Sequence, residues 1–120
     1  MTPSIHPKKW HIYIVDLEPQ VKSKPGKQRP CLAIQPSKLS ELGLTSTVVF
    51  PITSKLTPND AYPLRVRFPK GVCTLKVDSD VMIDQILAWD NSFFKKDLGE
   101  IPEFYQKKIT KALVDFLDWD

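Results

Sequence analysis

Hydrophobic residues in the first three quarters of the chain fall in short runs that are separated by polar, proline-containing stretches, a pattern typical of a β-rich domain. The first run, residues 10–17, is almost continuously apolar and rich in β-branched residues, which predicts a central strand packed on both faces. Residues 64–68 alternate strictly, so Leu64, Val66 and Phe68 should face the core and Arg65 and Arg67 should point outward. Five or six short strands are expected, drawn from residues 10–17, 30–35, 47–53, 64–68, 72–77 and 81–88.

The hydrophobic period changes from two to 3.6 near the C-terminus, which predicts one amphipathic helix over residues 102–119. The apolar stripe of this C-terminal helix comprises Tyr105, Ile109, Ala112, Leu113, Phe116 and Leu117. A short helical turn is also expected within 37–44. With 120 residues and 42% hydrophobic content, the chain suits a single domain spanning residues 1–120, in which a small barrel-like sheet is capped by that helix.

Positive charge is concentrated at the start of the chain. Residues 1–30 carry a net charge of +4, residues 31–90 sum to zero and residues 91–120 sum to −1, although the whole chain is only +3. This distribution favours a phosphate-bearing partner at the first strand and the loop that follows it. A solvated lysine-rich loop is the alternative.

The sequence contains little that would suggest metal binding, disulfides or a membrane. Cys31 and Cys73 lie in apolar surroundings without CxxC or Cys/His spacing, so buried free thiols are expected and no metal or other cofactor is indicated. Asp78, Asp80 and Asp84 lack the glycine and terminal glutamate of a calcium loop and are interpreted as turn residues. The absence of a signal-like or membrane-spanning run predicts a soluble, cytoplasmic protein.

Two stretches combine a strand with chemically useful side chains. Residues 26–34 form a flexible cationic loop that enters an apolar strand, with Arg29 at the junction and Pro30 restricting its backbone to extended geometry. Residues 47–54 place the hydroxyls of Thr53 and Ser54 at the end of another apolar strand. Each feature alone is also compatible with an ordinary surface arginine or a β-branched strand residue.

Together, Asp16-Leu17-Glu18-Pro19, Arg29-Pro30, Pro51-Ile52-Thr53-Ser54 and Asp84-Gln85 occur in an order and spacing that resembles the MazF/PemK family of toxins from bacterial toxin–antitoxin modules. The resemblance extends over essentially the whole chain. It implies an SH3-like β-barrel with a C-terminal helix, a homodimer and a metal-independent, sequence-specific endoribonuclease that cuts single-stranded RNA. It also implies a MazE-like antitoxin whose acidic tail occupies the RNA groove.

The resemblance assigns catalytic roles to Arg29 and Thr53, and an acid–base role to Asp84. The neighbouring Ser54 and Gln85 are expected to contact RNA. The lysines of the basic loop would hold the RNA backbone; these are Lys22, Lys24 and Lys27.

Cleavage by the 2′-oxygen requires removal of the 2′ proton, stabilisation of a charged phosphorane and protonation of the leaving oxygen. Arg29 suits the second task because a guanidinium gives bidentate, permanently charged bonds to phosphate. A guanidinium is a poor base. Asp84 is therefore the preferred proton acceptor, whereas His11 matches no family catalytic position and is interpreted as structural.

Two other functions remain open on the sequence alone. A CcdB-like toxin of the same fold poisons DNA gyrase through its C-terminus, and Asp118-Trp119-Asp120 invites that comparison, although helix packing would also account for Trp119. A catalytically inactive RNA-binding member of the fold is the other alternative. It is suggested by Lys24 at a position near which many members carry an acid, and by Leu87 near the usual arginine.

Overall fold

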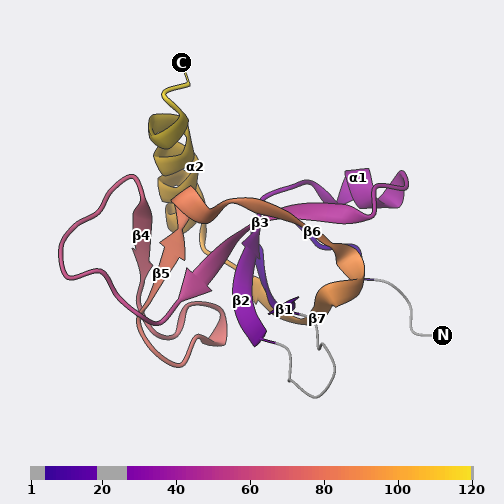
Figure 1. Cartoon of the computed structure of the whole chain (residues 1–120), viewed down its shortest axis with the longest axis horizontal. Coiled ribbons are helices and arrows are strands. Elements are labelled where there is room, and N and C mark those ends of the chain that lie inside the picture. The colour runs from indigo at the N-terminus through magenta and orange to yellow at the C-terminus, as the bar shows by residue number, and fades with distance from the viewer. Residues whose placement is uncertain (1–4, 19–26, 120) are drawn as a thin grey trace.

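The computed structural model describes residues 5–18 and 27–119, which form an antiparallel sheet and two helices (Figure 1). Lys22 and Lys24 lie outside the described residues. In chain order the elements are β1 (His11–Glu18), β2 (Lys27–Ala33), α1 (Ser37–Glu41), β3 (Ser46–Thr53), β4 (Arg65–Phe68), the 3-10 turn η1 (Val72–Thr74), β5 (Ser79–Met82), η2 (Ile83–Gln85), β6 (Leu87–Asp90), η3 (Asn91–Phe93), β7 (Phe94–Glu100) and α2 (Glu103–Leu117).

Seven strands form one sheet in the order β4-β5-β3-β2-β1-β7, and β6 adds to β3 outside this path. Every recorded strand pair is antiparallel. Within the described residues no pairing joins the two end strands, so the sheet is curved but open. The mainly β class with a C-terminal helix is confirmed, and the description as a barrel applies only loosely.

Both faces of the sheet are covered by apolar side chains, as the continuous pattern of the first strand predicts. Ile12 of β1 packs with β2, β3, β4, β5 and α2 residues on one face, whereas Tyr13 and Val15 pack with Cys31 and Val49 on the other. This alternation is the two-residue period of an extended chain. Figure 1 shows α2 beside β4 and β5, and α1 at the opposite end of the sheet.

The strand expected at 72–77 is wrong. Gly71 and Cys73 have φ values of 100° and 47°, and Thr74 has 60°, so the chain makes a left-handed turn through η1 where extended geometry is impossible. The paired strand β5 begins later, at Ser79. The apolar run at 72–77 reflects packing of Leu75 and its neighbours onto the core, because Leu75 is buried there.

The strand expected at 81–88 is divided between β5 and β6 by the turn η2, at the point where the polar pair Asp84-Gln85 interrupts the apolar run. The strand β7 was not predicted. Its sequence FKKDLGE is mostly charged because it forms an end strand of the sheet, paired only with β1 along the path, and such strands commonly carry charges that discourage aggregation.

The predicted helices are confirmed, and α2 carries most of its expected stripe. Ile109 and Ala112 are buried, and Tyr105, Leu113 and Phe116 pack against the core. Three other expectations are wrong. Leu117 and Leu64 are exposed by 46% and 41%, and Trp119 is 71% exposed beyond the end of α2, so packing of the helix does not account for it.

Candidate active site

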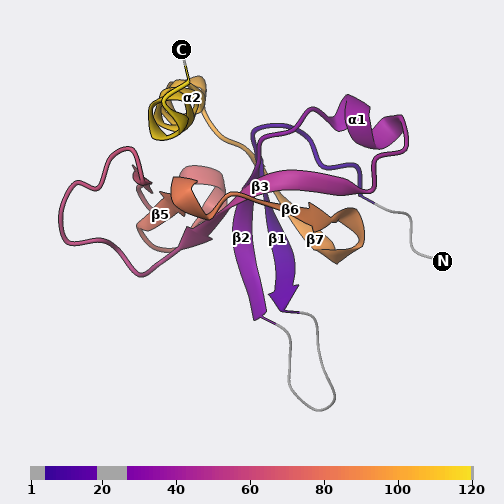
Figure 2. The same ribbon diagram turned by 45° about the horizontal axis from the view of Figure 1, so that its top comes forward.

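Arg29 lies in β2, one residue before Pro30, and its Cα is paired with that of Val15 in β1. Because β1 is buried on both faces, β2 is held against a rigid neighbour on that side. Figure 2 shows β1 and β2 projecting together from the rest of the sheet. The half-buried Arg29 is therefore carried by a restrained strand, as the Arg-Pro pair predicts.

On its other side β2 separates from β3. The last recorded pair between them is Cys31 with Pro51, after which β3 turns to pair with β5 through Thr53 and Asp80. The same register, if it continued for two more residues, would pair Arg29 with Thr53, but the described strands have already separated there and Thr53 is paired with Asp80 instead. Arg29 and Thr53 thus lie at equivalent positions on the two arms of a fork.

A cavity of about 330 Å³ occupies this fork, and we call it the fork cavity. Three of its described lining residues are cationic and none is acidic. Its third wall comes from the segment between η1 and β5. The lining residues are Lys27, Gln28, Arg29, Pro30, Ile52, Ser54, Leu75, Lys76, Val77 and Ser79.

The structure thus places Arg29, for which a catalytic role is predicted, at one cavity with Lys27 and Ser54, for which RNA contacts are predicted. Thr53 stands between two lining residues at the end of β3, but it is not itself among the residues that line the cavity. Its Oγ1 accepts a hydrogen bond from the backbone N–H of Lys55 at 3.1 Å. This bond uses the oxygen as an acceptor, so the hydroxyl proton can be donated to a ligand.

Asp84 and Gln85 lie in η2 and are not among the residues that line the fork cavity. The Oδ1 of Asp84 accepts a hydrogen bond from Nη1 of Arg65 in β4, and Oδ2 accepts one from the amide of Gln85 at 3.3 Å. Both carboxylate oxygens are therefore engaged. An acid–base role for Asp84 would require one of these bonds to open.

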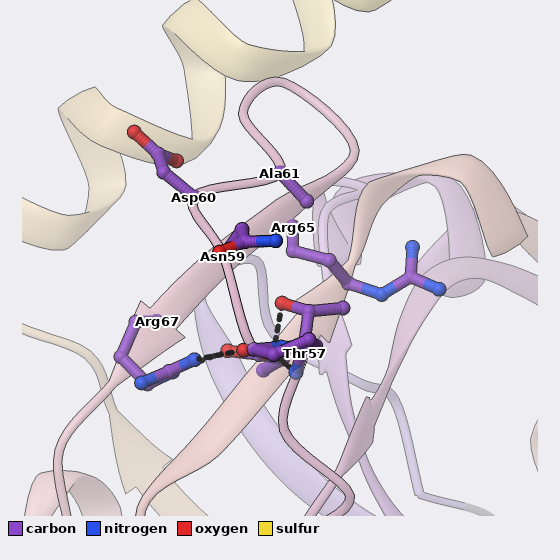
Figure 3. Close-up of a pocket in the computed structure, with 8 residues that line it drawn as sticks. Thr57, Asn59, Asp60, Ala61, Arg65 and Arg67 are labelled. Atoms are coloured by element: carbon purple, nitrogen blue, oxygen red, sulfur yellow. Dashed lines mark hydrogen bonds and ion pairs between the residues drawn. The ribbon is translucent and has the colours of Figure 1, made fainter.

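Arg65 belongs to a second cavity of about 340 Å³, which we call the ion-pair pocket (Figure 3). Nε of Arg67 donates to Oδ1 of Asp80 at 2.5 Å, and the dashed lines in Figure 3 also mark the bonds of Thr57. Its lining residues are Thr57, Pro58, Asn59, Asp60, Ala61, Arg65, Arg67 and Asp80. Unlike the fork cavity, this pocket contains carboxylates beside its arginines.

Asp80 is the structural centre of the ion-pair pocket. Its Oδ2 accepts hydrogen bonds from the backbone N–H and the hydroxyl of Thr57, at 2.9 and 3.1 Å. Burial opposes the charged carboxylate, but the bonds from Arg67 and Thr57 outweigh it and hold the pKa of Asp80 below its usual range. Asp80 therefore fixes β4 and the Thr57 loop to β5, which is more than the turn role expected from the sequence.

The remaining titratable groups have structural surroundings. Nδ1 of His11 lies 3.0 Å from Oδ1 of Asp97, which links β1 to β7 and agrees with the structural interpretation of His11. Both cysteines are free, and burial raises the pKa of the Cys31 thiol to about 12. Cys73 is only partly buried, less than expected.

Within residues 5–18 and 27–119, no group of three His, Cys, Asp or Glu side chains is placed to hold a metal. None of the helices described is long and apolar enough to cross a membrane.

Two elements of the site were missed from the sequence. Lys76 was not considered, because residues 72–77 were expected to be a strand rather than a cavity wall. The pairing of Arg65 and Arg67 with Asp84 and Asp80 was also missed. A signal for one of these pairs exists, since Arg67 and Asp80 are opposite charges directly across the antiparallel pair of β4 and β5, whereas Asp84 lies in the turn η2 beyond β5.

Comparison with solved structures supports the fold. A MazF from a MazE-MazF crystal structure of Deinococcus radiodurans is 22% identical, with a TM-score of 0.76 over 97% of this chain and 99% of that one. The Mycobacterium tuberculosis toxin MazF-mt6 is 21% identical, with a TM-score of 0.73 over 92% and 98% of the two chains. A mycobacterial endoribonuclease solved with its cognate antitoxin is 19% identical, with a TM-score of 0.72 over 95% and 97%.

The search of curated proteins found no match. The family comparison is decisive, because the sequence profile of the PemK-like, MazF-like toxins of type II toxin–antitoxin systems matches residues 8–117. That match includes both arms of the fork, η2 and the whole of α2. The chain therefore belongs to the PemK-like, MazF-like family of toxins from type II toxin–antitoxin systems.

Proposed function

We propose that this toxin is an endoribonuclease that cleaves single-stranded RNA in a sequence-specific, metal-independent reaction. The observation that carries the proposal is Arg29 in the lining of a cavity whose described residues include three cations and no acid. Membership of the toxin family and the fold shared with a mycobacterial endoribonuclease support it. An anionic polymer is the ligand that such a cavity attracts.

In the proposed reaction the ribose 2′-oxygen attacks the adjacent phosphorus and the bond from phosphorus to the 5′-oxygen breaks. The products are a 2′,3′-cyclic phosphate and a 5′-hydroxyl. Arg29 stabilises the charge that develops on the phosphorane, a contribution of about 3–4 kcal/mol for a well-placed donor. The hydroxyl of Thr53 donates to the same phosphate or orients the 2′-oxygen, and Lys27 and Ser54 hold the flanking backbone.

Asp84 is proposed as the group that governs proton transfer, in agreement with the family resemblance. In the resting chain its carboxylate binds Arg65 and Gln85. Entry of RNA next to η2 would compete for these partners, and Gln85, whose side chain is exposed, is proposed to contact a base. We further propose a homodimer and a MazE-like antitoxin whose acidic tail competes with RNA for the cationic cavity.

The direct test is incubation of the purified toxin with long single-stranded RNA in the presence of a metal chelator, followed by mapping of the new ends. We expect discrete cuts at one short sequence, with 2′,3′-cyclic phosphate and 5′-hydroxyl termini. Intact RNA at micromolar toxin would refute the proposal. Cuts that appear only after a divalent cation is added would refute its metal-independent form.

A gyrase poison of the same fold is the second candidate, because Trp119 is 71% exposed beyond the end of α2. The Arg29→Ala variant separates the two functions in growing cells. An endoribonuclease loses its toxicity with this substitution, whereas a toxin acting through its C-terminus retains growth arrest and loses it with Trp119→Ala.

A further inference from the structure

The segment from Leu75 to Ser79 forms the wall of the fork cavity that faces the start of β2. Lys76 lies in this wall and is exposed, and Lys27 and Arg29 line the same cavity from β2. These cations come from parts of the chain almost fifty residues apart. The cavity is thus bounded by positive charge on two of its sides.

The segment that carries Lys76 is held firmly at both ends. The carbonyl of Leu75 accepts a hydrogen bond from the N–H of Gly71 at 2.8 Å, and the Leu75 side chain is buried in the core. Beyond Lys76, Oδ1 of Asp78 accepts a bond from the N–H of Lys70 at 2.8 Å, and Ser79 begins β5. A backbone fixed in this way loses little freedom when the lysine engages a ligand.

We propose that the Lys76 side of the fork cavity is a second phosphate subsite, in which Lys76 contacts the RNA phosphate next to the one held by Arg29 in the same cavity. The proposal rests on the proposed function and adds to it a residue and a binding site. Lysine ammonium is a compact, donor-only charge suited to phosphate oxygens, and phosphate contacts fix the register of a nucleic acid. The exposed apolar side chain of Val77 offers a surface for the intervening ribose.

The ion-pair pocket does not suit this role, although it also contains arginines. Arg65 and Arg67 donate to Asp84 and Asp80, and the carboxylates would repel an approaching phosphate. In the fork cavity, the described lining residues place no acid beside Lys76. Lys76 therefore adds to the attraction for an anion without a carboxylate among the lining residues to oppose it.

The test measures binding of a mixed-sequence single-stranded RNA carrying 2′-O-methyl groups, which cannot be cleaved by 2′-oxygen attack. Lys76→Gln is compared with Lys70→Gln, which removes the same charge from a nearby exposed position outside the cavity lining. We expect Lys76→Gln to weaken binding several-fold and to lower the slope of log affinity against log salt by about 0.7, the effect of one phosphate contact on a single strand. Lys76→Arg should restore both, and Lys70→Gln should resemble the wild type.

Cleavage kinetics on unmodified RNA provide a second measurement. If Lys76 only binds one flanking phosphate, Lys76→Gln should raise KM and leave kcat nearly unchanged. If Lys76→Gln matches the wild type in affinity, salt slope and KM, the subsite is wrong while the proposed function stands. The subsite would also be wrong if Lys76→Gln lowered only kcat. It would likewise be wrong if the variant lost affinity for a glutamate-rich peptide, used as a stand-in for an acidic antitoxin tail, and kept its affinity for RNA. A wild-type toxin that neither binds nor cleaves RNA refutes the proposed function itself.

Discussion

The fork cavity and the ion-pair pocket both contain arginines, but their surroundings differ. In the ion-pair pocket, Arg65 and Arg67 are hydrogen-bonded to Asp84 and Asp80. The fork cavity combines Arg29 with two lysines, and its described lining has no carboxylate. A guanidinium bonded to an internal carboxylate has donors already in use. The ion-pair pocket therefore stabilises the fold, whereas the fork cavity is suited to an external anion.

Burial supports the same distinction. The Asp80 side chain is 1% exposed, whereas its partner Arg67 is 47% exposed, so the acid is the fixed member of that pair. The bonds from Thr57 complete the coordination of the buried carboxylate. A buried charge with several partners is costly to disturb, and the region around β4, β5 and the Thr57 loop depends on it.

The largest expected effect is the difference between removing Arg29 from the fork cavity and removing Arg67 from the ion-pair pocket. Arg29→Ala should lower kcat/KM for RNA cleavage about 100- to 1,000-fold, since a donor to the phosphorane is lost, and leave Tm nearly unchanged. Arg67→Ala should lower Tm, because Asp80 loses a partner, while the folded fraction still cleaves RNA. Cleavage of a defined RNA and thermal unfolding of both variants would measure the contrast, and a similar profile for the two would invalidate it.

Thr53→Val should have a smaller effect on cleavage. Loss of a hydroxyl that donates to a charged phosphate is worth about 1.5–3 kcal/mol, so kcat/KM should fall roughly 10- to 100-fold. Thr53→Ser is the matched control, because it retains the oxygen that accepts from the N–H of Lys55 and the proton that we assign to the phosphate. If the valine variant cleaves as well as the serine variant, Thr53 has only a structural role.

The general architecture could be predicted from the sequence because hydrophobic period is a local property. The strands ending at Thr53 and beginning near Arg29, and the amphipathic helix now described as α2, were all visible in the pattern. The predictions of secondary structure failed where tertiary contacts, rather than the local hydrophobic pattern, determine the backbone conformation. Left-handed backbone at Cys73 and Thr74 converts an apolar run into a turn, and no apolar pattern marks the charged strand β7.

The candidate site was only partly predictable for the same reason. Arg29, Lys27 and Ser54 could be associated because the family resemblance and their strand ends placed them together. Lys76 reaches the same cavity only because η1 folds back against the sheet, and a contact between residues so far apart leaves no local signal. The position of Asp84 in η2 was predictable, but its engagement by Arg65 depends on the arrangement of β4 beside β5.

The smallest expected effect is the dependence of stability on acid pH, and it tests the ion-pair pocket alone. Because the pKa of Asp80 in the folded chain lies below its unfolded value of about 3.9, the unfolded state binds the proton more readily. The stabilisation is complete above that value and is lost as pH falls through the folded pKa. Asp80→Asn should therefore reduce the free energy of unfolding by about 1–3 kcal/mol at neutral pH, and its urea midpoint should change less with acid than that of the wild type. Parallel acid profiles for the two proteins would mean that Asp80 does not hold this pocket together. The ion-pair pocket could then no longer be contrasted with the fork cavity as the one that stabilises the fold.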